Sequence, residues 1–346
     1  MDTNQQMFLI DAEIGGYTIR HFIDRGGFGE VYIVESTAEN QLYALKTEHL
    51  EITHSVLRKE YDILTSIQFS KFFPSIKHYG EYQKARILVM ELLGPSLSKL
   101  VRSIPKKKFS LATTLFIGLH CMCCIEDLHN KGFIHRDIKP NNFLFRNSNT
   151  FPICLIDFGL SQSYIDYEMH KHVDFGINDG FYGTPKYASV NALMKNRISR
   201  KDDIISLFYS LVELIEGDLP WPNGSECEKI LNIKSSIKCK YLFSSFPKQI
   251  RKCFKYINTL KFDQRPDYGI IKDAFHSELS SLSSNREIHF EWEYLSESTF
   301  DDLFYPGVDK SSPIWQIAFQ NHYNLPRFHS LRDLFPTNES KCQCRM

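Results

Sequence analysis

The sequence predicts an α+β protein with two lobes, an N-terminal antiparallel β-sheet that carries one helix and a mainly helical C-terminal lobe. Strand-like runs dominate from Tyr17 to about Leu93, and segments of helical character dominate from Ser96 onward. The length of 346 residues is too great for one small core and suits a two-lobed domain with an extension. We therefore expect an N-terminal extension at residues 1–16, lobes at 17–94 and 95–284, and a C-terminal extension at 285–346.

Short runs of β-branched and aromatic residues define the expected sheet. The RGGFG segment that separates the first two runs is a hairpin-type break. Apolar residues at helical spacing over His54–Ile67 predict the one helix of this lobe. The expected strands are Tyr17–Ile23, Glu30–Glu35, Leu42–Thr47 and Ile87–Leu92.

Four longer segments predict the helices of the C-terminal lobe: Thr113–Lys131, Lys201–Glu216, Pro247–Asn258 and Tyr268–Leu282. The first two end at Gly132 and Gly217. Glycine is common just after a helix because it adopts left-handed backbone angles at low cost. The region between Phe133 and Leu160 is irregular and dense in polar residues, which predicts neither a helix nor a long strand.

The composition is that of a soluble globular protein, with 42% hydrophobic and 24% charged residues. The 41 basic and 41 acidic residues balance, which argues against a general nucleic-acid binder. Nine scattered cysteines without paired zinc spacing indicate reduced thiols, so we expect a cytoplasmic or nuclear protein. No signal-peptide pattern is seen, and the apolar run Leu111–Leu128 carries His120, Glu126 and Asp127, which favours a core helix over a membrane span. We also expect a monomer.

The segment HRDIKPNNF, from His135 to Phe143, fits the catalytic-loop pattern H-R-D-x-x-x-x-N of protein kinases. The triplet Asp157-Phe158-Gly159 follows twenty residues after Asp137, at the end of the apolar run ICLI. Four fixed positions can match by chance, but two motifs in this order and spacing are very hard to obtain by accident. An ordinary polar surface loop is the alternative interpretation, and the second motif argues against it.

These residue types suit the transfer of a phosphoryl group from ATP, which depends on positioning and charge neutralisation. Asp137 is the candidate to accept the proton of a substrate hydroxyl, and Lys139, two residues later, is placed to reach the γ-phosphate. Asn142 and Asp157 offer oxygen ligands, which Mg²⁺ prefers. The sequence thus predicts ATP and Mg²⁺ as cofactors.

Upstream, the strand Tyr43-Ala44-Leu45-Lys46 ends in a lysine that fits the kinase position for pairing with the α- and β-phosphates. Glu60 lies fourteen residues later in the expected helix, where it can form an internal ion pair with Lys46. Glu48 and Glu51 are competing partners nearby. We favour Glu60 because it lies in the middle of the helix.

The glycine-rich loop departs from the kinase pattern. If Gly26 and Gly29 are the second and third glycines, Asp24 stands where the first belongs. An Asp there can repel the phosphates and restrict the turn, which affects ATP affinity more than the fold. Gly27 lies between the two glycines, and Phe28 at the loop tip can cover the phosphates.

From Tyr17 to about Leu282, the chain resembles the casein kinase 1 group of Ser/Thr protein kinases, closest to the tau-tubulin kinase and casein-kinase-1-like branch. Most other kinases close the activation segment with A-P-E, whereas this chain has Ala188-Ser189-Val190, as in that group. The segments that carry the resemblance are MELLGPSL (Met90–Leu97), HRDIKPNNF, GTPKYAS (Gly183–Ser189), SRKDDIISLFYSLVE (Ser199–Glu213), LPW (Leu219–Trp221) and KFDQRPDY (Lys261–Tyr268).

The resemblance implies further site residues. Met90 is the expected gatekeeper, and Glu91 to Leu93 form the hinge that binds adenine. Asp203 is expected to brace the catalytic loop. Ile23, Val31, Ala44 and Leu144 would enclose the base. Lys186, Arg200 and Lys229 would form a basic site, so the expected partners are protein substrates with acidic or phosphorylated motifs.

Two other functions compete with an active Ser/Thr kinase. A pseudokinase or scaffold would keep the fold without transferring phosphate, but Lys46, Asp137 and Asp157 are all present and only Asp24 favours it. A tyrosine kinase is disfavoured because Lys139 in HRDIKPNN is typical of the Ser/Thr form of the loop.

Overall fold

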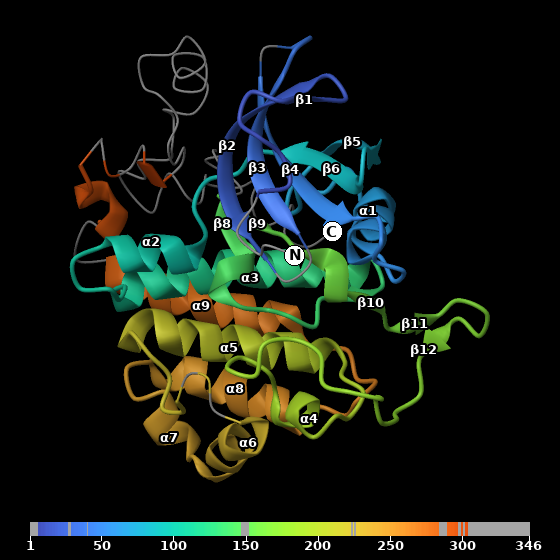
Figure 1. The fold of residues 1–346 in the computed structure, drawn as a ribbon. Helices are drawn as coiled ribbons and strands as arrows, with labels where there is room; N and C mark the ends of the chain where they lie inside the picture. The colour runs from blue at the N-terminus through green and yellow to red at the C-terminus, as the bar shows by residue number, and fades with distance from the viewer. Residues whose placement is uncertain are drawn as a thin grey trace.

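An antiparallel sheet with one helix forms the upper lobe in Figure 1, and a group of packed helices forms the lower lobe. This computed structural model describes residues 6–26, 29–39, 41–146, 152–222, 224, 226–283, 289–296, 299 and 302–303. The chain passes from the upper lobe to the lower one between strand β6 (Ala85–Glu91) and helix α2 (Leu97–Ser103). The two-lobed α+β fold predicted from the sequence is confirmed.

The upper-lobe sheet has six antiparallel strands in the order β1-β2-β3-β4-β6-β5. Four strands match the predicted runs within a few residues. Strand β5 escapes the prediction because its sequence, IKHYGEY, is mostly polar and lacks an apolar alternation. Helix α1 (Val56–Ser66) packs against β4, β5 and β6. The strands are β1 (Glu13–Ile14), β2 (Tyr17–Arg25), β3 (Glu30–Ser36), β4 (Leu42–His49), β5 (Ile76–Tyr82) and β6.

Helix α1 begins at a polar cap. The Ser55 side chain accepts a backbone N–H of the first turn at 2.9 Å. The Glu48 carboxylate accepts the N–H groups of Val56 and Leu57 at 2.8 and 3.1 Å, at the positive end of the helix dipole. Glu48 therefore caps the start of the helix, which leaves Glu60 as the partner of Lys46.

Helix α3 (Leu111–Asn130) is the centre of the lower lobe and packs against α5 (Arg200–Glu216) and α9 (Tyr268–Ser283). The glycines that follow α3 and α5 have φ angles of +87° and +89°, as predicted for caps. The remaining helices are α4 (Val190–Leu193), α6 (Cys227–Ser236), α7 (Cys239–Leu242) and α8 (Lys248–Thr259), with single turns at Pro140–Asn142, Phe158–Leu160 and Glu291–Tyr294. The short strands are β7 (Phe133–Ile134), β8 (Phe143–Phe145), β9 (Ile153–Leu155), β10 (Gln162–Ser163), β11 (Ile165–Asp166) and β12 (Lys171–His172).

Helix α3 is also the one helix within the described ranges that is long and apolar enough to cross a membrane. The rest of the fold buries 78% of its most apolar 18-residue window. The prediction of a core helix at this run is confirmed.

Both ends of the described chain pack beyond the boundaries expected from the sequence. Strand β1 pairs with β2, and Phe8 and Ile14 are buried in the core of the upper lobe. At the other end, Phe290 and Trp292 are buried in the core of the lower lobe. Parts of residues 6–16 and 289–296 therefore pack against the lobes, and the domain boundaries at 16/17 and 284/285 stay predictions.

Glu291 and Leu303 connect this end of the described chain to the lower lobe by polar contacts as well. Glu291 accepts the backbone N–H of Ser110 at 2.7 Å and the hydroxyl of Thr113 at 2.5 Å, so its carboxylate completes the cap at the start of α3. Lys99 on α2 donates to the carbonyl oxygen of Leu303 at 3.3 Å.

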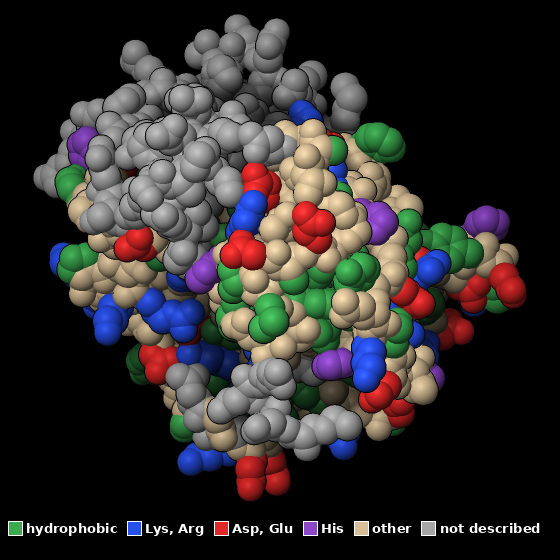
Figure 2. Space-filling model, turned by 45° about the horizontal axis from the view of Figure 1, so that its top comes forward, with side chains coloured by type: hydrophobic (Ala, Val, Ile, Leu, Met, Phe, Trp, Pro, Cys, Tyr) green, Lys and Arg blue, Asp and Glu red, His purple; other side chains and the backbone are tan. Residues whose placement is uncertain are grey.

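On the face shown in Figure 2, basic and acidic side chains are interspersed outside the grey region.

Candidate active site

The catalytic loop is held from below by Asp203 of α5. Its Oδ2 accepts the backbone N–H of His135 at 2.6 Å and its Oδ1 that of Arg136 at 2.9 Å. Arg136 has a left-handed φ of 72°, which is costly for a residue with a side chain. Burial acts to raise the pKa of Asp203, but hydrogen bonds from His129 and the loop outweigh burial and lower it. The brace expected for Asp203 is present and stabilises a strained turn beside Asp137.

Asp137 is almost completely buried and is held by side chains on both sides of its carboxylate. Lys139 donates to its Oδ2 at 2.6 Å, and the hydroxyl of Thr184 donates to its Oδ1 at 2.7 Å. Lys139 also reaches the Thr184 oxygen at 3.1 Å. Thr184 is not among the site residues predicted from the sequence, so its contact with Asp137 is one that sequence reasoning missed.

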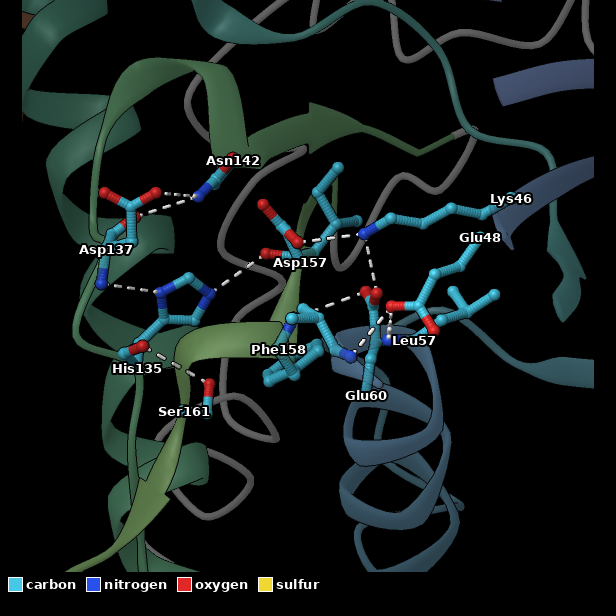
Figure 3. A network of polar contacts seen from close by, with 12 residues as sticks. Lys46, Glu48, Leu57, Glu60, His135, Asp137, Asn142, Asp157, Phe158 and Ser161 are labelled. Atoms are coloured by element: carbon cyan, nitrogen blue, oxygen red, sulfur yellow. Dashed lines mark hydrogen bonds and ion pairs between the residues drawn. The ribbon is translucent and has the colours of Figure 1, made fainter. Parts of the chain in front are cut away.

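Lys46 forms the predicted internal ion pair. Its Nζ lies 2.6 Å from Oε2 of Glu60 and 2.9 Å from Oδ1 of Asp157. Figure 3 shows this lysine between the Glu60 side chain from α1 and the Asp157 side chain that follows β9. The interaction joins the upper-lobe sheet, its helix and the lower lobe at one ammonium group.

The charges around Lys46 favour an ammonium between carboxylates. Burial acts to lower the pKa of Lys46, but the adjacent carboxylates of Glu60 and Asp157 outweigh it and raise the pKa. The Lys46 charge lowers the pKa of Asp157 and outweighs its burial. Asp157 therefore stays ionised near neutral pH, as a ligand for a metal ion requires.

Asn142 and Asp157 are the residues that would hold a Mg²⁺ ion, because both can present a free oxygen ligand. The Asn142 amide donates its Nδ2 to the carbonyl oxygen of Asp137 at 2.9 Å, so the orientation presents its oxygen as a ligand. Asp157 uses Oδ1 for Lys46 and retains Oδ2, and its side chain is 40% exposed. Figure 3 shows both side chains between Asp137 on one side and Lys46 on the other.

The strand register brings several predicted nucleotide-pocket residues together. Val31 pairs with Lys46 across β3 and β4, and Ala44 pairs with Met90 across β4 and β6. A Cβ atom at Gly29 would lie 1.6 Å from the carbonyl oxygen of Thr47, so only glycine fits there.

The hinge after β6 is open for a ligand at Leu93. No hydrogen bond to its backbone N–H or C=O is formed within the described part of the chain, whereas the backbone N–H of Glu91 donates to Ser75. An unpaired donor and acceptor on one residue suit the edge of an adenine ring. Leu144 in β8 forms a bridge with Ser96 just beyond the hinge, where it can contact the base.

Asp24 lies in the exposed end of β2, close to Ile23 and Gly26. Gly26 donates its backbone N–H to the carbonyl oxygen of Gly29 at 2.8 Å, which closes the base of the loop. Burial lowers the pKa of Lys99 on α2, and the nearby Asp24 carboxylate opposes that shift. The predicted loop-tip residues Gly27 and Phe28 lie outside the described residues.

The basic substrate site expected from the sequence is not assembled. Lys186 lies between the carboxylates of Glu213 and Asp218 at 2.5 and 2.8 Å, so its charge is already balanced. Arg200 is buried, its guanidinium lies 4.4 Å from the ring centroid of Tyr164, and it donates to a backbone carbonyl at 2.6 Å. Of the three expected cations only Lys229, on α6, is exposed. The sequence shows how many basic residues lie in this region, but it does not show which of them are paired with carboxylates.

Comparison with known proteins agrees with this geometry. The protein kinase domain model matches residues 17–278. A probable serine/threonine-protein kinase from Dictyostelium discoideum is 31% identical over 288 residues, which cover 82% of this chain and 58% of that protein. The chain thus spans less than two thirds of the length of this curated relative. The domain match, together with the Lys46 ion pair and the Lys139 contact with Asp137 in the catalytic loop, shows that the chain belongs to the protein kinase family.

Proposed function

We propose that this chain is an active kinase that transfers the γ-phosphoryl group of ATP to Ser and Thr hydroxyls of proteins. The observation that carries the proposal is the contact of Thr184 with both Asp137 and Lys139, formed while Lys46 is paired with Glu60. The Lys46–Glu60 ion pair, the catalytic carboxylate and the activation segment are therefore arranged together in one structure.

Each residue has a distinct task in this proposal. Asp137 orients the substrate hydroxyl and accepts its proton, and Lys139 lies beside it to balance the charge of the phosphoryl group. Lys46 places the α- and β-phosphates. Mg²⁺, held by Asn142 and Asp157, would neutralise the charge that develops on the phosphate oxygens.

The choice of Ser and Thr is supported by Lys139 in the catalytic loop and by the Dictyostelium relative, which is described as a probable serine/threonine-protein kinase. The test uses three peptides that differ only in a central Ser, Thr or Tyr, with radiolabelled ATP and Mg²⁺. We expect label on the Ser and Thr peptides and none on the Tyr peptide. Nucleotide binding without transfer to any peptide would favour the pseudokinase instead.

We further propose that the chain lies in the casein kinase 1 group. Two features of the activation-segment end support this proposal. Ser189, at the second position of the altered triplet, caps α4 and donates to Asp202 at 2.6 Å. Arg265, which pairs with the A-P-E glutamate in other kinases, here donates to Asn130 at 3.2 Å.

A preference for acidic or phosphorylated substrates was expected from Lys186, Arg200 and Lys229. The first is balanced by two carboxylates and the second is buried. The proposal therefore covers protein hydroxyls without that preference.

The kinase is expected to be active without phosphorylation of its activation segment. Arg136, the residue beside the catalytic Asp, lies 4.5 Å from the ring centroid of Tyr182 and donates to Gln162 at 2.7 Å. These contacts hold the arginine where other kinases use a phosphate group. Protein treated with phosphatase, and shown by mass spectrometry to be unmodified, should retain its kcat. Loss of activity that an upstream kinase restores would contradict this expectation.

A further inference from the structure

Lys234 of helix α6 is buried, with 6% of its surface exposed, and its ammonium group meets three backbone carbonyls of one short segment. Its Nζ donates to the carbonyl oxygens of Pro185, Lys186 and Ala188 at 2.9, 3.0 and 2.6 Å. An ammonium group has three N–H donors, so these contacts use all of them. The side chain therefore fits this turn of backbone as a three-point anchor.

The surroundings of Lys234 are aromatic. Its Nζ lies 4.6 Å from the ring centroid of Trp221 and 4.7 Å from that of Tyr209. Trp221 donates its indole N–H to the carbonyl oxygen of Lys186 at 2.8 Å, so the same carbonyl is held from two sides. No carboxylate forms an ion pair with Lys234 in the described part of the chain.

A buried charge without a carboxylate partner is costly, and burial lowers the pKa of Lys234 to about 7. An apolar side chain would fill this space between two aromatic rings at less cost. The three carbonyls and two ring faces favour the charged form and offset part of that cost. The three carbonyls belong to residues 185–188, and the position of this segment indicates what the Lys234 anchor does.

The anchored segment joins two parts of the active site. Thr184, directly before it, bonds to Asp137 and Lys139. Ser189, directly after it, begins helix α4. A shift of residues 185–188 would therefore move the Thr184 hydroxyl away from the catalytic carboxylate and disturb the surface next to it, where a substrate hydroxyl must lie.

We propose that Lys234 is a positioning residue for the kinase reaction, which sets the backbone at 185–188 and thereby aligns Thr184 and the adjoining substrate surface. The triplet Ala188-Ser189-Val190 has no glutamate that could pair with Arg265, and Arg265 donates to Asn130 instead. Lys234 therefore supplies the contact that holds this end of the activation segment. The proposal rests on the proposed transfer to protein hydroxyls. We expect nucleotide binding around Lys46 not to depend on this anchor.

The experiment compares wild type with Lys234→Met, which keeps the length of the side chain but has no donor, and with Lys234→Arg, which keeps the charge and the donors. The peptide and ATP concentrations are varied separately. We expect Lys234→Met to lower kcat/KM for the peptide by about 10- to 100-fold, because small displacements near the reacting atoms have effects of this size. The KM for ATP should stay near that of wild type, and Lys234→Arg should recover part of the lost activity.

Lys248→Met is the matched control, because this lysine is exposed on α8 and has no contact with the active site within the described residues. It should behave as wild type. Equal losses in peptide and ATP parameters, or an unchanged Lys234→Met enzyme, would overturn the proposal. If Lys234→Met does not fold, Lys234→Gln, which retains two donors, should show the same split between peptide and ATP with a smaller loss.

Backbone hydrogen exchange tests the anchor without relying on activity. Lys234→Met should increase exchange in residues 184–193 and leave α5 protected. Unchanged exchange at 184–193, or a rise across the whole lower lobe, would show that Lys234 does not position this segment. A wild-type enzyme that phosphorylates no peptide would contradict the proposed function instead, and the exchange result would still decide the anchor.

Discussion

Asp137→Asn is expected to lower kcat by about 100- to 10,000-fold, because an amide cannot accept the proton of the substrate hydroxyl. Asn keeps the size of the side chain and can still accept from Lys139 and donate or accept at Thr184, so the loop should keep its shape. ATP binding should be close to that of wild type, since Lys46 and Asp157 are unchanged. The measurement is kcat on a Ser peptide, together with the rise in Tm on addition of Mg²⁺ and ATP.

Asp273→Asn provides the control, because Asp273 is exposed on α9 and the same chemical change there should leave kcat unaltered. Full activity of purified Asp137→Asn protein would show that another group accepts the proton, and the assignment of the catalytic residue would be wrong. Loss of nucleotide binding in this variant would mean that the substitution disturbed the loop.

Trp292→Ala is expected to lower the free energy of unfolding by about 3–5 kcal/mol, the usual range for removal of a buried Trp or Phe side chain. Trp292 is buried, stacks on Phe290 with ring centroids 4.7 Å apart, and meets the edges of Phe109 and Phe145 at 5.8 and 5.1 Å. Phe145 ends strand β8, which also carries Leu144 of the nucleotide pocket. The check is denaturant unfolding of wild type and variant under the same conditions.

Tyr294→Ala serves as the comparison in the same turn, because Tyr294 is 74% exposed and its removal should change stability by no more than about 0.5 kcal/mol. Equal effects of the two substitutions would show that residues 289–296 are not part of the core. The match to the protein kinase domain ends at residue 278, so the expected difference would establish that the folded unit continues past the family domain.

The sequence located most of the catalytic residues because their signals are local. Asp137, Lys139 and Asn142 lie in one nine-residue motif, and Asp157 follows at a fixed distance. The pairing of Lys46 with Glu60 could also be predicted, since a strand followed by a helix limits which glutamate faces back to the sheet. The helix ends at Gly132 and Gly217 depended only on the conformational freedom of glycine.

Strand β5 and the packing of residues 289–296 could not be predicted from the sequence. Strand β5 is held by its pairing with β6 rather than by its own composition, and residues 289–296 join the core through aromatic contacts with α3 and β8. Strand propensity depends on neighbours across the sheet, so a polar edge strand gives little signal of its own.

The sequence by itself thus determined the fold class, the catalytic motif and the family resemblance. Only the tertiary structure decided which cations are available and which side chains support the site. Lys186 meets carboxylates 27 and 32 residues away, Thr184 meets Lys139 across 45 residues, and Lys234 meets Ala188 across 46. A charge or hydroxyl in a linear sequence carries no information on its distant partner, because that partner is set by how the helices pack and not by local spacing.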